Sequence, residues 1–327
     1  MYCTIIFIIG YTTGSPCSAA HKKLVLFVII MSDVGEAINF CRFVELRNDA
    51  VIIHNGYKLW INDNDESGLF EALSSTQKHD NGPISISEDG LMPFMVLGSH
   101  PALRYRGNAI RRSKIWMQDD YSKGLLRYGY TGWQHAIAPA TCSIEAFPCV
   151  KKIMDGLNEI FPFMLTFYNM PLCDAKFNHV IFTRYENHED CIGMHSDKEA
   201  DFVPGSYFVV IKLGAARRFV FSDRNNKTLF NECLNEGAMI IVKTGKGSSN
   251  QIMKHGVPPS VDKCGGSGSL VFRAIQTLIP WHEVAKNIMR AEIAKQRRFN
   301  AKQERKRKKQ ESSKEGKEGK ERTKKKQ

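Results

Sequence analysis

Two short patterns in this sequence place a histidine two residues before an aspartate: His188-Glu189-Asp190 and His195-Ser196-Asp197. On a β-strand, residues i and i+2 point to the same face, so either pair can offer an imidazole nitrogen and a carboxylate oxygen to one metal ion. A second histidine from a distant strand would complete a facial triad, the ligand set that holds non-haem Fe(II) and leaves positions open for a cosubstrate and O₂. Because His-x-Asp also occurs by chance, each pattern alone is far more often a solvated turn than a metal site.

The sequence around His195 carries further motifs in a fixed order. They are Asn178-x-Val180 with Arg184-Tyr185, Asp190-x-Ile192-Gly193-x-His195-x-Asp197-x-Glu199, Leu213-Gly214-Ala215-x-Arg217-x-Phe219-Val220-Phe221, His255-x-Val257-Pro258 and Leu270-x-Phe272-Arg273. Together they resemble the AlkB-type Fe(II)/2-oxoglutarate-dependent dioxygenases, most closely the nucleic-acid demethylases of the DNA-repair branch. The resemblance spans about residues 109–279, and several motifs in order are far more specific than any one of them.

The resemblance implies a fold and a metal centre. The fold would be α+β, with a double-stranded β-helix (jelly-roll) core and flanking helices. The iron ligands would be His195, Asp197 and His255, with His188 in the loop before the metal strand. Fe(II), 2-oxoglutarate and O₂ would be the cofactor and cosubstrates.

The cosubstrate contacts match the family only in part. Tyr185 and Arg273 correspond to family residues, whereas Thr183 stands where the family has asparagine. The first of two arginines in the last strand is replaced by Ser267, within a glycine-rich segment. We expect Lys212 either to point inward and supply the missing positive charge or to face solvent.

Substrate contacts can also be transferred from the resemblance. An aromatic segment would line a pocket for a flipped-out base, an acidic residue would face the exocyclic amine of the methylated base, and arginines would contact phosphates. These residues are Tyr128 and Tyr130, Glu199, and Arg111, Arg112 and Arg217, with Trp116 at the start of the recognition flap. Two core tyrosines and ordinary exposed arginines remain the alternative interpretation.

Hydrophobic periodicity predicts the elements that position these residues. An apolar stripe from Val150 to Phe161 recurs at helical spacing and predicts an amphipathic helix that ends at Pro162. A shorter helix is expected over Ser67–Ser75, and His79–Gly90 reads as a loop. The runs typical of an antiparallel sandwich or barrel are His179–Tyr185, Tyr207–Leu213, Arg218–Ser222, Ala238–Lys243 and Ser269–Ile275.

The net charge of +12 is confined to the end of the chain. Residues 285–327 alone carry a net +12, so the remainder is electroneutral. This basic tail lacks apolar periodicity beyond its first turns and is expected to be disordered, with helix only near Ile288–Ile293. We divide the chain into an apolar leader of unknown role (1–31), an N-terminal extension (32–98), the dioxygenase domain (99–284) and the tail (285–327).

Composition also bears on the compartment. The nine cysteines are scattered without a Cys-x-x-Cys pair, which favours free thiols in a reducing compartment over a structural zinc site. The apolar runs of the leader are too short to span a membrane, so no membrane association is expected. The protein is expected to be intracellular, and the basic tail is compatible with the nucleus. The sequence gives no oligomeric state.

The resulting functional prediction is oxidative demethylation of N-alkylated bases, of the 1-methyladenine or 3-methylcytosine type, in DNA or RNA. The partner would be methylated nucleic acid, and the reaction would be coupled to decarboxylation of 2-oxoglutarate. Two alternatives stay open. One is a catalytically weakened AlkB-like protein that binds nucleic acid, and the other is a 2-oxoglutarate oxygenase that acts on protein.

Overall fold

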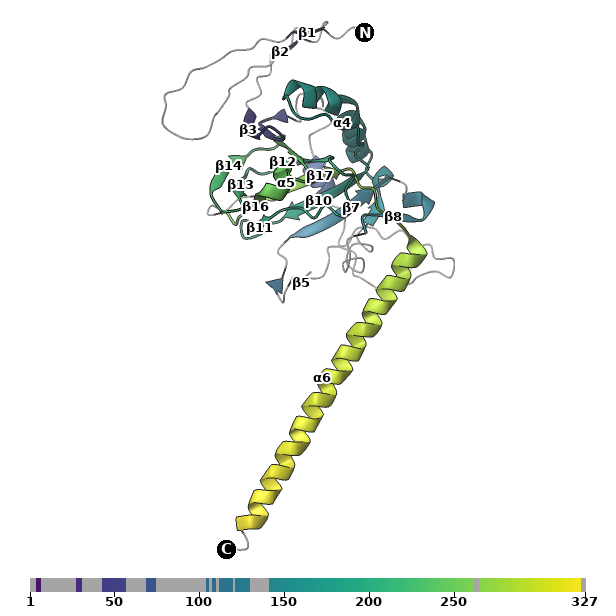
Figure 1. The fold of residues 1–327 in the computed structure, drawn as a ribbon, viewed down its shortest axis with the longest axis vertical. Coiled ribbons are helices and arrows are strands. Elements are labelled where there is room, and N and C mark those ends of the chain that lie inside the picture. Colours follow the sequence, from purple (N-terminus) through teal and green to yellow (C-terminus); the bar gives the residue numbers. More distant parts are fainter. Residues whose placement is uncertain are drawn as a thin grey trace.

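In the computed structural model, two antiparallel sheets lie face to face and a long helix projects from them (Figure 1). The structure describes residues 4–6, 28–30, 43–56, 69–74, 104–105, 108–109, 112–119, 121–129, 141–260 and 265–324. The expected loop over His79–Gly90, Tyr130 and Arg111 lie outside these residues.

The major sheet has eight strands, antiparallel except for the parallel pair at one edge. In spatial order they are β3 (Phe43–Arg47), β4 (Ala50–Ile53), β15 (Met239–Lys243), β12 (Tyr207–Gly214), β17 (Ser267–Arg273), β10 (His179–Tyr185), β7 (Ser113–Gln118) and β9 (Thr141–Ser143). The minor sheet orders β11 (Ile192–His195), β16 (Met253–Val257), β13 (Arg217–Asp223) and β14 (Thr228–Leu234). This arrangement of two sheets with flanking helices confirms the predicted jelly-roll core.

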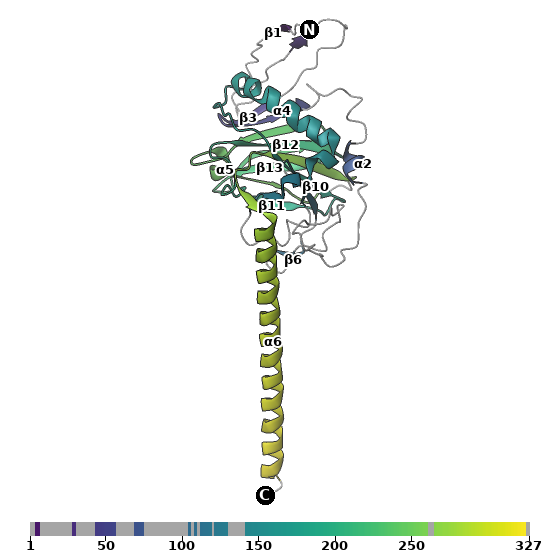
Figure 2. The same ribbon diagram turned by 90° about the vertical axis from the view of Figure 1, so that its right-hand side faces the viewer.

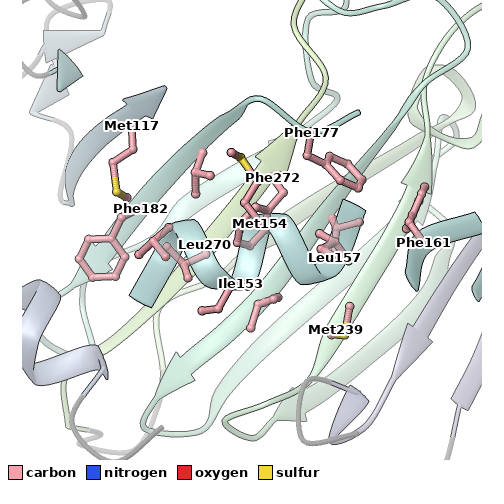
Figure 3. Close-up of a cluster of buried hydrophobic side chains, with 14 of the residues drawn as sticks. Met117, Ile153, Met154, Leu157, Phe161, Phe177, Phe182, Met239, Leu270 and Phe272 are labelled. Atoms are coloured by element: carbon pink, nitrogen blue, oxygen red, sulfur yellow. The ribbon is translucent and has the colours of Figure 1, made fainter. Parts of the chain in front are cut away.

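Both faces of the major sheet are buried, which explains why its central strands read as continuous apolar runs. Along β12, every residue from Tyr207 to Leu213 is buried. One face packs against helix α4 (Pro148–Phe167), and Figure 3 shows Met154 and Leu157 of α4 among Phe272 and Leu270 of the sheet. The other face packs against the minor sheet through a second apolar cluster. The space between the two sheets is the interior in which the candidate site lies.

The predicted helix over Val150–Phe161 is present, but its predicted end at Pro162 is wrong. Helix α4 continues through Pro162 to Phe167. Proline has no N–H to donate to the carbonyl of Asn158, four residues earlier. The Lys176 ammonium donates to that carbonyl at 3.1 Å instead, so the helix passes the proline without leaving this acceptor unpaired.

The predicted strands over 179–185, 207–213, 218–222, 238–243 and 269–275 correspond to β10, β12, β13, β15 and β17. The expected short helix is α2 (Leu69–Ser74). The boundary at residue 98 needs correction, because β3 and β4 extend the major sheet by pairing with β15. At least this part of residues 32–98 is therefore integral to the core.

The expectation of a disordered tail is also wrong, because residues Trp281–Lys324 form one helix, α6. Among the described residues, its first turn is anchored: Trp281 and Val284 pack with Leu126, and the Trp281 N–H donates to the Gly124 carbonyl at 3.0 Å. Beyond that turn α6 runs straight away from the sheets (Figure 2). Its sequence lacks an apolar stripe but is rich in Lys, Glu, Arg, Ala and Gln, residues that favour helix without burial.

Small elements complete the described chain. They are the pairs β1 (Thr4–Ile6) with β2 (Val28–Ile30), β5 (Arg104–Tyr105) with β6 (Asn108–Ala109), and β8 (Leu125–Arg127) with β18 (Leu278–Pro280), the 3₁₀ turns Tyr121–Lys123 and Ile144–Ala146, and helix α5 (Ser249–Ile252). No helix of the described chain is both long enough and apolar enough to cross a membrane.

Asn158 generates a testable prediction about how α4 is tied to the sheet. Its side chain accepts a hydrogen bond from the Phe177 N–H at 2.7 Å and donates to the Phe177 carbonyl at 2.9 Å, just before β10 begins. Asn158→Ala removes both bonds, and we expect a loss of about 1–3 kcal/mol in the free energy of unfolding. Urea denaturation measures this loss. The exposed neighbour Glu159 provides the control, and equal stability of Asn158→Ala and Glu159→Ala would contradict the assignment.

Candidate active site

The three predicted metal ligands lie together at the end of the minor sheet. His195 on β11 and His255 on β16 are directly paired in the antiparallel register, with ring centroids 4.4 Å apart. Asp197 follows β11, and one donor atom from each of the three residues lies within 4.8 Å of the others. Two imidazole nitrogens and one carboxylate oxygen at this separation can bind one divalent metal ion, with coordination positions left over.

The Asp197 carboxylate divides its two oxygens between two partners. Oδ2 accepts a hydrogen bond from Arg273 Nη2 at 2.6 Å, and Oδ1 lies 3.5 Å from His195 Nε2. Burial alone would raise the pKa of the Asp197 carboxyl, but Arg273, His195 and His255 outweigh it and hold that pKa well below its usual range. Oδ1 is therefore an ionised donor on the side of the histidines, as a divalent cation requires.

His255 is prepared for the same role by its surroundings. Burial, reinforced by the neighbouring His195, lowers the pKa of His255 to about 3, so the ring is neutral at physiological pH. Phe208, Phe219 and Phe221 surround it, with ring centroids 5.6, 6.3 and 5.7 Å away. A neutral imidazole within an apolar wall can bind a cation without first losing a proton.

The segment that carries Asp197 is clamped by Asn250. The Asn250 side chain accepts a hydrogen bond from the Asp197 N–H at 2.9 Å and donates to the Asp197 carbonyl at 2.9 Å. The same amide donates to Glu199 Oε1 at 2.6 Å, and Gln251 donates to Glu199 Oε2 at 3.1 Å. Asn250 thus holds in place both Asp197, a candidate metal ligand, and Glu199, the carboxylate predicted to contact the substrate. The sequence analysis did not identify this role of Asn250.

His188 lies apart from this group. It belongs to the turn between β10 and β11, where its carbonyl accepts a hydrogen bond from the Ser260 N–H at 2.7 Å. Asp190 stabilises the same turn, because its carboxylate accepts a hydrogen bond from the Glu186 N–H at 2.7 Å. In the structure, the His188-Glu189-Asp190 pattern forms a turn.

Two arginines predicted to contact nucleic acid are used inside the protein instead. Arg217 is 2% exposed, donates to the carbonyls of Asn187 and Asp190, and lies over the Tyr185 ring at 4.9 Å. Arg112 is partly buried and donates to the Cys191 carbonyl at 3.0 Å. Both arginines brace the loop before β11, so the prediction that they contact phosphates needs correction. The alternation along β13, where Arg217 shares the inward face with Phe219 and Phe221, could have signalled this for Arg217; Arg112 lies one residue before β7.

Tyr128 lies next to Arg273, the residue that pairs with Asp197. Its ring is buried, 5.3 Å from the ring of His179, and Arg273 lies 5.7 Å from its centroid. Its backbone has φ 88°, a left-handed conformation that is costly for a bulky residue and concentrates at functional sites. Trp116, predicted at the start of a flap, is a buried residue of β7 in the cluster between the sheets.

Two residues of this interior were not anticipated from the sequence, the buried His179 and the partly buried Lys114. His179 is fully buried with no hydrogen-bond partner for either ring nitrogen within the described chain, and burial, with Arg273 and Arg127 nearby, holds its pKa well below the usual value. Lys114 is coupled electrostatically to Arg112, Arg273 and Asp197, and burial is the main cause that lowers its pKa to about 7. Lys114 lies two residues before Trp116 on β7 and hence on the same interior face.

The residues predicted to hold the cosubstrate also lie in this interior. Thr183 and Tyr185 of β10 and Arg273 of β17 are all buried. Lys212 is 5% exposed, so it lies inside the protein and not in solvent; its ammonium donates to the carbonyls of Leu213 and Ala215 at 2.6 and 2.9 Å.

Two histidines and one aspartate at the end of the minor sheet of a jelly-roll core agree with the metal site implied by the resemblance to the Fe(II)/2-oxoglutarate-dependent oxygenases. No family model matches the chain. Curated relatives do: the chain is 39% identical over 101 residues to the human DNA oxidative demethylase ALKBH2, a match covering 31% of this chain and 34% of the relative. The Arabidopsis thaliana protein of the same name is 24% identical over 106 residues, 32% of this chain and 29% of that protein.

These relatives confirm the resemblance to the AlkB type, and the matched part is about a third of their length. Among solved structures, OsALKBH1 aligns with a TM-score of 0.42 at 16% identity, over 71% of this chain and 99% of that one. A Trichoplax adhaerens prolyl hydroxylase, in complex with a peptide of hypoxia inducible factor, aligns with a TM-score of 0.37 at 11% identity, over 69% and 84% of the two chains.

The triad yields a direct prediction about metal binding. His195→Ala, Asp197→Ala and His255→Ala should each reduce Mn(II) affinity by at least tenfold or about 1.4 kcal/mol, because a facial triad has no spare protein ligand. Isothermal titration calorimetry measures this affinity without turnover. His188→Ala is the matched control and should bind Mn(II) like the unmodified protein. Loss of binding in His188→Ala with retention in His195→Ala would reverse the assignment.

Proposed function

We propose that this protein removes methyl groups oxidatively from N-alkylated bases in nucleic acid, with Fe(II) as cofactor and 2-oxoglutarate and O₂ as cosubstrates. The observation that carries the proposal is the convergence of His195, Asp197 and His255 beside Arg273, with the pKa values of the Asp197 carboxyl and the His255 ring lowered so that the carboxyl is ionised and the ring is neutral. The DNA oxidative demethylases to which the chain is similar support DNA as the polymer.

The cosubstrates account for every atom and electron of the proposed reaction. Fe(II) held by the triad supplies the chemistry that couples decarboxylation of 2-oxoglutarate to oxidation of a C–H bond by O₂. One oxygen atom enters succinate, which forms together with CO₂, and the other enters the N-methyl group. The hydroxymethyl group then leaves the base as formaldehyde, and the nitrogen recovers an N–H or its lone pair.

The residues of this chain contribute binding and orientation. Asp197 Oδ1 and the two imidazoles would hold the cation, while Arg273 pairs with the other carboxylate oxygen and fixes its direction. Tyr128 offers an aromatic wall next to His179 on which a flipped-out base can stack. Tyr130 is proposed to extend that wall from two residues further along the chain.

Glu199 is proposed to select cationic methylated bases such as 1-methyladenine or 3-methylcytosine. A carboxylate favours a positively charged base over a neutral one and accepts hydrogen bonds from its exocyclic amine. The amides of Asn250 and Gln251 hold both oxygens of Glu199, and each carboxylate oxygen has lone pairs for a second donor. The carboxylate is therefore pre-oriented and still able to accept.

Helix α6 is proposed to supply affinity for the phosphate backbone. The segment 285–327 carries all the excess positive charge of the chain, and the residues between 301 and 308 are exposed. Lysine and arginine bind phosphates regardless of sequence by releasing counterions. A nuclear location agrees with this proposed substrate.

The candidate alternative is a catalytically weakened AlkB-like protein that binds nucleic acid without turnover. Ser267 favours it, because it replaces an arginine that the resemblance expects to hold the far carboxylate of 2-oxoglutarate. A serine offers one neutral hydroxyl, whereas an arginine offers a charged fork.

Release of succinate and formaldehyde from methylated oligonucleotides tests the proposal. With Fe(II) and 2-oxoglutarate, an oligonucleotide containing 1-methyladenine or 3-methylcytosine should yield both products, and the unmethylated oligonucleotide should yield no formaldehyde. Asp197→Ala should lower turnover by at least a hundredfold, about 2.7 kcal/mol. Tight binding of the methylated oligonucleotide without either product would favour the weakened binder.

Deletion of residues 285–327 tests the role of the helix. We expect weaker binding of nucleic acid and a flatter dependence of affinity on salt, with the preference among methylated bases unchanged. Replacing Arg305, Lys306, Arg307 and Lys308 by glutamine removes four charges while keeping helix-forming residues, and should reproduce part of both effects. A changed base preference in either variant would overturn this assignment.

A further inference from the structure

A hollow of about 400 Å³ opens at one end of the major sheet. Its walls come from the β3–β4 turn, from the residues just before β12 and from the loop that links β15 to α5. The residues that give this sheet-end hollow its chemistry are Arg47, Asp49, Gly205, Lys243, Lys246 and Ser248. Hollows of about 300–1,000 Å³ are typical of sites for small ligands, so the volume admits a ligand and the lining decides its kind.

Two lysines give the sheet-end hollow its positive charge. The Lys243 ammonium lies 5.8 Å from the centroid of the Tyr207 ring, and Lys246 is exposed at the rim. Neither ammonium has a hydrogen-bond or ion-pair partner among the described residues. Both charges are therefore available to an anion that enters the hollow.

The lining also contains one carboxylate, that of Asp49, which is already engaged. It accepts hydrogen bonds from the Ser249 N–H at 3.0 Å and from the Ser249 hydroxyl. Arg47 Nε lies 3.1 Å from the same carboxylate. Arg47 thus offsets the charge of Asp49, and the lysines leave the hollow with a net positive charge.

A buried hydroxyl without a partner belongs to the same lining. Ser248 is 5% exposed, and its hydroxyl forms no hydrogen bond within the described chain. Folded proteins leave few buried polar groups unpaired, because an unsatisfied donor is unfavourable. A ligand oxygen in the hollow would complete the bonding of this hydroxyl.

Glycines keep the wall formed by the β15–α5 loop free of side chains. Gly245 and Gly247 have φ of 103° and 75°, a conformation that other residues adopt only with strain. A Cβ at position 245 would lie 3.2 Å from the backbone nitrogen of Gly205, which also lines the hollow. The hollow therefore depends on glycine at this position.

The sheet register places the hollow at the same end of the sheet as the candidate metal centre. Lys243 pairs with Tyr207 on β12, and the next residue, Phe208, pairs with Arg273, the partner of Asp197. One strand separates β15 from β17, which corresponds to about 10 Å. The nucleotides of a strand rise about 3.4 Å each, so a strand whose base reaches the metal centre can place a phosphate about three nucleotides away at the hollow.

Phosphate contacts near the metal centre have to come from cations other than the predicted arginines. Arg112 and Arg217 donate to backbone carbonyls inside the protein. The hollow supplies two unengaged lysines instead, and lysine binds phosphate as a point charge.

We propose that Lys243, Lys246 and Ser248 bind a phosphate group in the sheet-end hollow. The group belongs to the nucleic-acid strand whose base enters the metal centre, and a free nucleotide offers the same chemistry. The inference rests on the proposed function and adds to it a phosphate contact, separate from α6, that sets the register of the strand.

Three single variants and a matched control test this site. Lys243→Gln and Lys246→Gln each remove one charge, and Ser248→Ala removes the unpaired hydroxyl. Lys152→Gln is the control, because Lys152 is an exposed lysine of α4 that does not line the hollow. Each full-length protein is titrated, without Fe(II) so that no turnover occurs, with a short single-stranded oligonucleotide containing 1-methyladenine and separately with AMP. Fluorescence anisotropy at several salt concentrations and calorimetry measure the two affinities.

We expect the affinity for the oligonucleotide to fall about three- to tenfold in each lysine variant, because a charge-assisted contact is lost. In the double variant of both lysines, the slope of log affinity against log salt should flatten by about 0.7, the value for one phosphate of a single strand. Ser248→Ala should bind about two- to fivefold more weakly without a lower thermal midpoint of unfolding, because its hydroxyl has no partner in the folded protein. Lys152→Gln should match the unmodified protein.

The AMP titration distinguishes the two sources of phosphate. Losses confined to the oligonucleotide identify the strand as the occupant, whereas equal losses for AMP identify a free nucleotide. Either pattern supports a phosphate site in the hollow.

Lysine variants that bind both ligands like Lys152→Gln, with the same salt dependence, would overturn the site. A lower thermal midpoint in Ser248→Ala with unchanged affinity would assign that serine to the fold and remove it from the site. Both results leave the proposed function standing, because formaldehyde release tests it separately. Phosphate binding in the hollow without formaldehyde release would reject the proposed function alone.

Discussion

The ion pair between Asp197 and Arg273 joins the two sheets at the point where their chemistry meets. Asp197 follows a strand of the minor sheet and Arg273 ends a central strand of the major sheet, so their 2.6 Å contact fixes one sheet against the other. The same contact keeps the Asp197 carboxyl ionised in a buried setting that would otherwise favour its neutral form. A buried arginine and a buried carboxylate are each unfavourable alone, and the pairing makes both tolerable.

The sequence was sufficient to predict the features that depend on local hydrophobic pattern and on the order of motifs, namely the central strands and the candidate metal ligands. The strands β10, β12 and β17 read correctly because both of their faces are buried, and the triad was identified because its motifs occur in a fixed order. Arg217 and Arg112 were assigned to phosphate contacts because the resemblance implies arginines with that role at their positions. Their partners are backbone carbonyls of a turn, and such acceptors leave no trace in residue types.

Lys114 shows the limit most clearly. It belongs to a strand that was not predicted, and its electrostatic coupling to Asp197 and Arg273 depends on a register that pairs β7 with β10 and β10 with β17. Those strands lie far apart in the chain. Helix α6 illustrates the opposite limit: the missing apolar stripe correctly predicted that the tail does not pack, but intrinsic helix preference, which needs no packing, was given too little weight.

The rigidity of α6 also sets how its charge is presented. Arg305, Lys306, Arg307 and Lys308 are consecutive and exposed, and four residues make slightly more than one turn of an α-helix. Cations therefore point outward around the whole circumference of the rod. A polyanion approaching from any azimuth meets the same attraction, so the helix raises the frequency of encounter without imposing an orientation. If the proposed nucleic-acid substrate binds, its alignment with the candidate metal centre would be left to the two sheets, because most of the charge of α6 lies away from them (Figure 2).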